Sequence, residues 1–161
     1  QAQQQQLPGD KIAHAALLGF INRNYDHDDR GCWFFQNGPQ RVYLNLEATP
    51  YIARSDPQHG FILQTGVPLA AIEAAYLCDN GALILRNDHI VAQVDDRDMA
   101  HVLPALRVDG QAAGDEALLA WLENGQGNLM LLHDGKEIAV QPLAYASVPQ
   151  TFGFQRAPQA E

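Results

Sequence analysis

Three stretches of the sequence resemble one another and recur at a nearly regular period. Each opens with glycine, continues with an apolar run, meets a turn signal and resumes with aliphatic residues. Asn-Gly and Asp-Gly between apolar runs are the strongest short-range signal for a β-hairpin, because the turn residues must tolerate positive φ. The sequence therefore predicts three hairpins, whose starts are 50 and 46 residues apart. They are GCWFFQNGPQRVYLNLE from Gly31, GALILRNDHIVAQVDD from Gly81 and GNLMLLHDGKEIAVQPL from Gly127, with turns at Asn37-Gly38, Asn87-Asp88 and Asp134-Gly135.

A segment with helical signals precedes each hairpin. Cap, apolar stripe and glycine stop are the features of a short amphipathic helix. The chain is therefore predicted to be α+β, with three tandem helix–strand–strand (αββ) pseudo-repeats that form a mainly antiparallel sheet with helices packed on one face. The helical segments are GDKIAHAALLGFINRN with Asp10 as N-cap, TGVPLAAIEAAYLCDNG with Pro68 near its start, and GDEALLAWLENGQG with Asp115 as N-cap.

The length of 161 residues fits one domain with a single core. Unit one carries extra material, which we expect to form another extended pair around Ser55-Asp56-Pro57. In unit two, DMAHVLPALRVDG is compatible with a short helix or an irregular turn. The expected boundaries are a flexible Gln-rich lead-in at 1–9, one domain at 10–155 with repeats at about 10–66, 67–112 and 113–155, and a flexible tail at 156–161.

The first strand of every predicted hairpin is apolar on both faces, as in Trp33-Phe34-Phe35 and Leu83-Ile84-Leu85. Continuous apolar strands are normally covered on both sides. Three helices on one face leave the other face without a cover, and burying each such side chain is worth roughly 1.5–3 kcal/mol. Either the sheet curls on itself, or it packs against a second subunit.

The net charge of −9, with only ten scattered basic residues, argues against partners that are themselves polyanions. Nucleic acids and anionic lipid surfaces bind clustered Lys and Arg, so we expect neither as a partner. No apolar run approaches the roughly 18 residues of a membrane helix. The chain begins QAQQQQLPGD with no intact secretory signal, which favours a cytoplasmic protein, although a processed start stays open.

The densest group of reactive side chains is Asp26-His27-Asp28-Asp29, followed by Arg30. Carboxylate and imidazole groups are metal ligands, so these four residues are the candidate metal site. The spacing does not fit a calcium loop, and a zinc site would need further ligands. The alternative is a solvated loop. Because units two and three pass from helix to strand more directly, we interpret this acidic loop as an insertion that the architecture does not require.

Neither cysteine has the surroundings of a nucleophile. Cys32 heads an apolar strand, where a thiol is usually a small buried hydrophobe, although His27 is near enough in sequence to suggest a nucleophile–base pair. Cys78 lies near a predicted helix C-terminus, which opposes thiolate formation. Two separate thiols are expected, and a single disulfide bridge stays open.

A second acidic cluster, Asp95-Asp96-Arg97-Asp98 with His101, follows the second hairpin. Helix capping by Asp95 or Asp96 explains it, and a joint metal site with residues 26–29 is the alternative.

The leading hypothesis is a non-enzymatic protein-binding or regulatory module that self-associates, or docks a protein partner, through its apolar sheet face. We expect no cofactor, because the nucleotide-binding and hydrolase motifs are missing. The alternatives are a small metal-dependent hydrolase that uses the clusters at 26–29 and 95–101, and a small-ligand binding module. The candidate binding or interface residues are Arg30, Trp33, Phe35 and Tyr43, with a role in the core as the competing interpretation.

Overall fold

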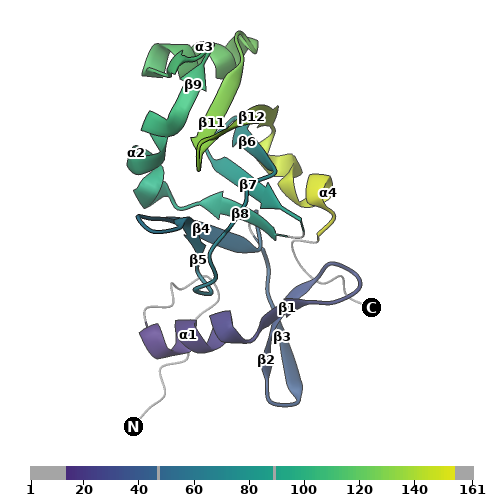
Figure 1. Cartoon of the computed structure of the whole chain (residues 1–161). Coiled ribbons are helices and arrows are strands. Elements are labelled where there is room, and N and C mark those ends of the chain that lie inside the picture. Colours follow the sequence, from purple (N-terminus) through teal and green to yellow (C-terminus); the bar gives the residue numbers. More distant parts are fainter. Residues whose placement is uncertain (1–13, 47, 89, 155–161) are drawn as a thin grey trace.

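The chain folds as a mixed α+β protein with mainly antiparallel sheets, which confirms the predicted class (Figure 1). The computed structural model describes residues 14–46, 48–88 and 90–154, so the predicted lead-in, the Asp10 cap and the tail lie outside the described residues. The strands are β1 Tyr25–His27, β2 Trp33–Asn37, β3 Gln40–Tyr43, β4 Tyr51–Asp56, β5 Gly60–Leu63, β6 Ala74–Cys78, β7 Leu83–Asn87, β8 Ile90–Val94, β9 Leu106–Val108, β10 Gln111–Ala112, β11 Leu129–His133 and β12 Lys136–Leu143.

The helices are short and lie on both sides of the large sheet. Helices α2 and α3 contribute Val102 and Trp121 to the core cluster on one face, and α4 contributes Val148 to the cluster on the other. The expectation that all helices cover one face is therefore wrong. The helices are α1 Ala15–Arg23, α2 Met99–Val102, α3 Asp115–Asn124 and α4 Val148–Phe152, with the 3₁₀ helices η1 Asp96–Asp98, η2 Leu103–Ala105 and η3 Tyr145–Ser147.

Two sheets are present in the described part of the chain. A small one has the order β1-β2-β3, and a nine-stranded one has the order β10-β9-β11-β12-β6-β7-β8-β4-β5. In the large sheet β4 runs parallel to β8 and β12 runs parallel to β6, while the other neighbouring pairs are antiparallel. The first hairpin therefore does not join the other two in one sheet.

All three predicted hairpins form, as β2–β3, β7–β8 and β11–β12. Their turns contain Gly38, Asp88 and Asp134, whose φ angles of 58°, 51° and 50° are the reason why glycine and aspartate stand there. The extra pair expected around residues 55–57 also forms, as the β4–β5 hairpin.

The helix predicted for unit two is wrong, because its second half is strand β6. Ala75, Leu77 and Cys78 are all at most 4% exposed, since β6 lies between β12 and β7 in the middle of the large sheet. A short apolar run covered on both faces has the same sequence pattern as a buried helix. Position in the sheet, which is a tertiary property, decides between them.

A three-stranded antiparallel meander recurs, and the predicted helices of units one and three form as α1 and α3. The meanders are β1-β2-β3, β6-β7-β8 and β9-β11-β12, and in the third α3 and β10 lie between the first two strands. The pairing register agrees in all three: Phe35 faces Tyr25 and Val42, Leu85 faces Ala75 and Ala92, and Leu131 faces Leu106 and Ile138.

The large sheet curls, so that its two ends share one core. Phe61 of β5 and Leu106 of β9 belong to the same buried cluster, although their strands lie at opposite ends of the sheet. The rings of Phe61 and His133 are 5.6 Å apart, and a Cβ on Gly60 would lie only 2.5 Å from the His133 ring. The sequence leaves open two ways to cover the apolar face, a curled sheet or a second subunit. In this structure the curl covers it.

Candidate functional site

The acidic loop is a tightly bonded turn rather than an open cluster of ligands. The carboxylate of Asp28 accepts the backbone N–H groups of Arg30 and Cys32 at 2.9 and 3.0 Å. It also accepts hydrogen bonds from the Arg30 guanidinium and the Tyr43 hydroxyl, both at 3.2 Å. Desolvation raises the pKa of Asp28, but these hydrogen bonds outweigh it and hold the pKa below its ordinary value.

The interpretation of this loop as an insertion is wrong. The same turn joins β6 to β7 in the second meander, where Gly81 (φ 86°) replaces Gly31 (φ 80°). In both turns the glycine N–H donates to the residue three positions earlier, at 3.0 Å for Gly31 and 2.9 Å for Gly81. Residues 28–32 are therefore the ordinary link between the first two strands of a meander, and Asp26 and His27 belong to β1 itself.

No metal centre forms among the described residues. Within them, no three His, Cys, Asp or Glu side chains are placed to hold an ion. Asp26 pairs with the neighbouring His27 at 3.6 Å, the His27 ring stacks on Trp33, and Asp29 is exposed. The second acidic cluster is engaged elsewhere, with Arg54 of β4. The structure therefore does not bring the two clusters together.

The aromatic candidates hold the small sheet to its surroundings. Trp33 is 5% exposed and packs against Tyr25 and Tyr51, at centroid distances of 4.7 and 5.3 Å. Phe35 meets Phe20 of α1 edge-to-face at 6.2 Å, which anchors the helix on β2. These contacts assign both residues to packing.

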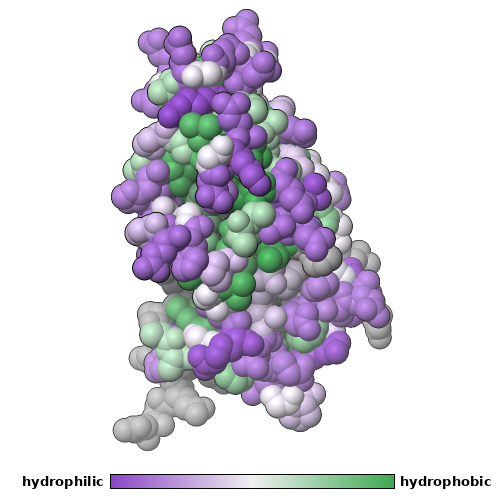
Figure 2. Space-filling view, viewed as in Figure 1, coloured by the Kyte–Doolittle hydropathy of each residue, from purple (hydrophilic) through white to green (hydrophobic). Residues whose placement is uncertain are grey.

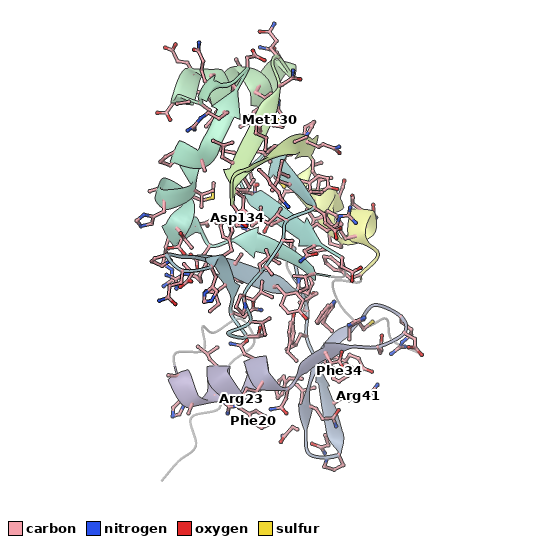
Figure 3. All side chains as sticks on the ribbon, viewed as in Figure 1. Phe20, Arg23, Phe34, Arg41, Met130 and Asp134 are labelled. Carbon is pink, nitrogen blue, oxygen red and sulfur yellow. The ribbon has the colours of Figure 1, made fainter. Side chains whose placement is uncertain are left out.

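On the other face of the small sheet, Phe34 packs against Tyr43 at 5.7 Å. The Arg41 guanidinium lies 4.4 Å from the Phe34 centroid (Figure 3). The candidate Arg30 is held by Asp28, as described above. The four predicted interface residues thus have structural partners within the chain.

The two thiols, Cys32 and Cys78, are both buried and are not joined by a disulfide. Burial and then the charge of Asp79 raise the pKa of the Cys78 thiol to about 11. A thiol with so high a pKa is a poor nucleophile at neutral pH.

A groove beside α1 has a largely apolar lining. Leu18 and Asn22 of α1 form one wall, and Ile52 and Arg54 of β4 form the other, with a cavity volume of about 840 Å³. Exposed Leu17 and Val67 extend the apolar surface, and Figure 2 shows apolar side chains gathered over this part of the molecule. Apolar grooves with a few fixed polar groups are the usual form of a binding site. We call this surface the α1 groove.

Gln64 positions the helix over the groove. Its side-chain amide accepts the Ile52 N–H at 2.7 Å and donates to the Pro50 carbonyl at 3.3 Å, as a neighbouring strand residue would. Its backbone carbonyl accepts Asn22 Nδ2 at 3.3 Å. These bonds and the Phe20–Phe35 contact fix α1 beside β4.

Two arginine–aspartate pairs form the polar rim of the groove. Arg54 Nε donates to Asp98 at 2.7 Å, and Arg97 Nη2 donates to Asp95 at 2.8 Å. Asp95 also accepts the backbone N–H of Arg97, which confirms the predicted capping role. The Arg97 guanidinium lowers the pKa of Asp95 to about 2. The rim is consequently close to neutral.

The low pKa of Asp95 predicts a specific response to acid. Its folded value of about 2 lies below the ordinary 3.8, so the stabilisation is complete above about pH 4 and is lost as pH falls toward 2. We expect the melting temperature of Asp95→Asn, measured by circular dichroism, to fall less between pH 5 and pH 2 than that of the unsubstituted protein. The melting temperature of the control Asp96→Asn should fall by as much as that of the unsubstituted protein. Equal acid responses of Asp95→Asn and the unsubstituted protein would contradict the pairing.

The comparisons with known proteins give a family but no function. A family model with the description "Protein of unknown function (DUF2946)" matches residues 1–159. No curated protein and no solved structure matches the chain. Among the described residues, no helix has the length and apolar character needed to span a membrane.

Proposed function

The chain belongs to this family of proteins of unknown function, and we propose from the geometry that it is a protein-interaction module in which two copies join through α1 and the α1 groove. The observation that carries the proposal is the exposure of α1. Its sequence AALLGFINR is mostly apolar, yet none of its nine residues is buried. Leu17 and Leu18 are each 40% exposed. An apolar helix of this kind normally buries its stripe against a partner.

The large sheet does not offer the docking surface that the sequence suggests. Leu83, Ile84 and Leu85 are all 0% exposed, because the curl of the sheet covers one face and α4 covers part of the other. The proposed interface therefore lies on α1 and not on the large sheet.

Charge favours a second copy of the chain as the occupant. A protein with a net charge of −9 repels itself over most of its surface. Helix α1 has no acidic residue and ends in Arg23, and the arginines of the groove rim are paired with aspartates. Self-repulsion is therefore weak at this surface.

The shape also suits a two-fold dimer. The helix and the groove lie on the same side of the molecule, so a two-fold axis can place Leu18 of each copy in the α1 groove of the other. A nine-residue helix is only roughly 14 Å long. Contact between two such helices alone buries less than the roughly 1,200 Å² of a stable interface, and the groove supplies the remaining area. We expect a reversible dimer.

Leu18→Asp should dissociate this dimer. Placing a carboxylate at the centre of an apolar contact costs about 2 kcal/mol or more, or roughly 30-fold in the dissociation constant. Sedimentation equilibrium over a concentration series measures the change, and circular dichroism checks that the variant folds.

Leu119→Asp is the matched control, because Leu119 is a 55% exposed leucine on α3, away from the α1 groove. We expect this variant to sediment as the unsubstituted protein does. A protein that is monomeric at every concentration contradicts self-association and leaves α1 for a different protein partner. Equal effects of the two substitutions contradict the location.

A further inference from the structure

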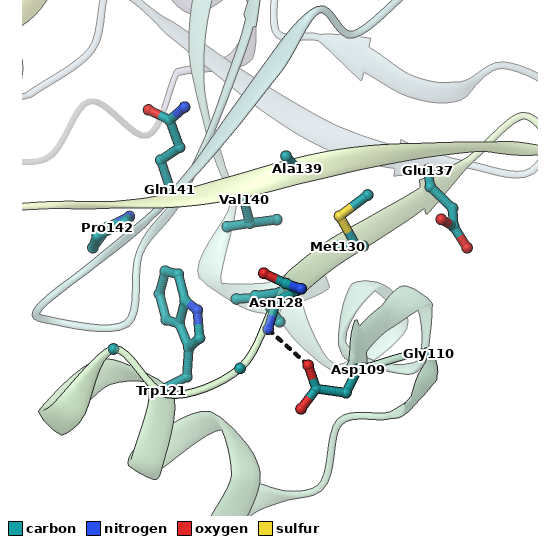
Figure 4. Close-up of a pocket in the computed structure, with 13 residues that line it drawn as sticks. Asp109, Gly110, Trp121, Asn128, Met130, Glu137, Ala139, Val140, Gln141 and Pro142 are labelled. Carbon is teal, nitrogen blue, oxygen red and sulfur yellow. Dashed lines mark hydrogen bonds between the residues drawn. The ribbon is translucent and has the colours of Figure 1, made fainter.

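A second groove lies between α3 and the β11–β12 hairpin (Figure 4). It exists because β12 continues after its pairing with β11 has ended: the ladder stops at Ala139, and the following residues pair only with β6. Pro142 stands in this half-paired stretch, where a missing N–H costs no ladder bond on the open side. The cavity of about 650 Å³ is in the size range of small-ligand sites.

The wall of this groove contains a donor without an acceptor. Trp121 is only 4% exposed, and no residue in the described part of the chain accepts a hydrogen bond from its indole N–H. In Figure 4 the nitrogen-bearing edge of the indole lies on the side of Asn128. The ring is buried, but its nitrogen is not among the fully buried polar atoms, so the N–H is open to the groove. An acceptor on a bound molecule would satisfy it.

The opposite side of the groove carries negative charge that no cation in the described residues neutralises. Asp109 Oδ1 accepts the Asn128 N–H at 3.0 Å, which fixes the carboxylate beside the groove. Neither Asp109 nor Glu137 forms an ion pair with a described residue. The nearby guanidinium of Arg107 is bonded to the carbonyls of Pro104 and Leu106 instead.

The surrounding segment adds to the negative charge near the groove. Residues 103–143 contain six carboxylates against two basic side chains, Arg107 and Lys136. A concave site with one sign of charge and apolar walls concentrates the opposite charge. The ligand that suits the groove is therefore a cation with an apolar stem.

We propose that the groove between α3 and the β11–β12 hairpin binds a basic amino-acid unit, that is, a guanidinium or ammonium group on an apolar stem followed by a carbonyl. The cation pairs with Asp109 and Glu137, and the stem lies along Met130 and Trp121. The carbonyl accepts the Trp121 N–H. The same unit occurs as a free amino-acid derivative and as a residue within a peptide.

Tryptophan fluorescence tests the proposal. The chain has two tryptophans, so Trp33→Phe leaves Trp121 as the only reporter. We expect N-acetyl-arginine amide to change the emission saturably, and N-acetyl-glutamine amide and N-acetyl-glutamate amide to have no such effect. Titration calorimetry on the unsubstituted chain repeats the measurement without the Trp33 substitution. No saturable binding of the arginine probe by either method, or equal binding of the glutamine probe, overturns the proposal.

Asp109→Asn is the decisive variant, because it keeps an acceptor for the Asn128 N–H and tolerates the φ of 51° at this position. It should weaken arginine binding by about tenfold or more. Asp134→Asn removes the same charge from a hairpin turn outside this groove, also at positive φ, and should leave binding within a factor of about two. Equal losses in the two variants overturn the proposal.

The two sources of the ligand are separated by comparing arginine methyl ester with a blocked Ala-Arg-Ala tripeptide. Tighter binding of the tripeptide identifies a peptide as the source, and equal binding identifies the free amino-acid unit. Both results require the basic unit that the proposal names.

Discussion

Ile84→Ala and Leu85→Ala should each lower the free energy of unfolding by about 2–5 kcal/mol. The two residues are neighbours on β7 and point to opposite faces of the large sheet, and both are 0% exposed. Leu85 belongs to the core cluster inside the curl, and Ile84 belongs to the cluster under α4. Each substitution therefore leaves a cavity in a core that the chain itself covers.

Urea unfolding at two protein concentrations makes this prediction specific. Losses that do not change with concentration indicate a cover from the same chain, and losses that grow on dilution indicate a second subunit. Leu119→Ala, at an exposed position, should change the free energy of unfolding by no more than about 0.5 kcal/mol. A loss below about 1 kcal/mol at only one of the two β7 positions would mean that one face of the sheet is open.

Trp33→Ala should cost about 3–5 kcal/mol, the largest loss that we expect from a single substitution in the small sheet. The indole packs against Tyr25, His27 and Tyr51, and so connects β1 and β2 to β4. Removing it leaves a cavity between the small sheet and the rest of the molecule. Chemical denaturation gives the free energy, and near-ultraviolet circular dichroism reports the loss of aromatic packing.

Trp33→Phe is the matched control, because it keeps a ring among these aromatic residues and should cost less than half as much. A small loss for Trp33→Ala with an unchanged aromatic spectrum would contradict the packing role. Trp33 would then be free to act as the binding residue that the sequence also allows.

The hairpins could be predicted from the sequence because their signals are local. A turn that needs positive φ at Gly38, Asp88 or Asp134 selects a few residue types wherever it occurs. The segment around β6 gave a wrong prediction for the opposite reason. Ala-rich AAIEAAYL is compatible with a helix, and only its place between β12 and β7 makes it a strand.

The α1 groove could not be predicted because its parts are distant in the sequence. Arg54 and Asp98 are 44 positions apart, and Asn22 and Gln64 are 42 apart. The sequence shows the apolar stripe of α1, and such a stripe predicts a buried helix face. It does not indicate that this face stays exposed in the folded chain. The charge of the acidic loop suggests a metal site, but Asp28 uses its charge to accept two backbone N–H groups and close a turn.

Hydrogen–deuterium exchange of α1 as a function of protein concentration tests the central claim most directly, since it reports both association and its location. If a second copy covers this helix, the backbone amides of Ala15–Arg23 will exchange more slowly as concentration rises, and those of α3, a helix of similar length, will not. In Leu18→Asp the effect should disappear. Exchange of the α1 amides at the same rate at every concentration, even in a protein that forms dimers, would contradict the proposed interface.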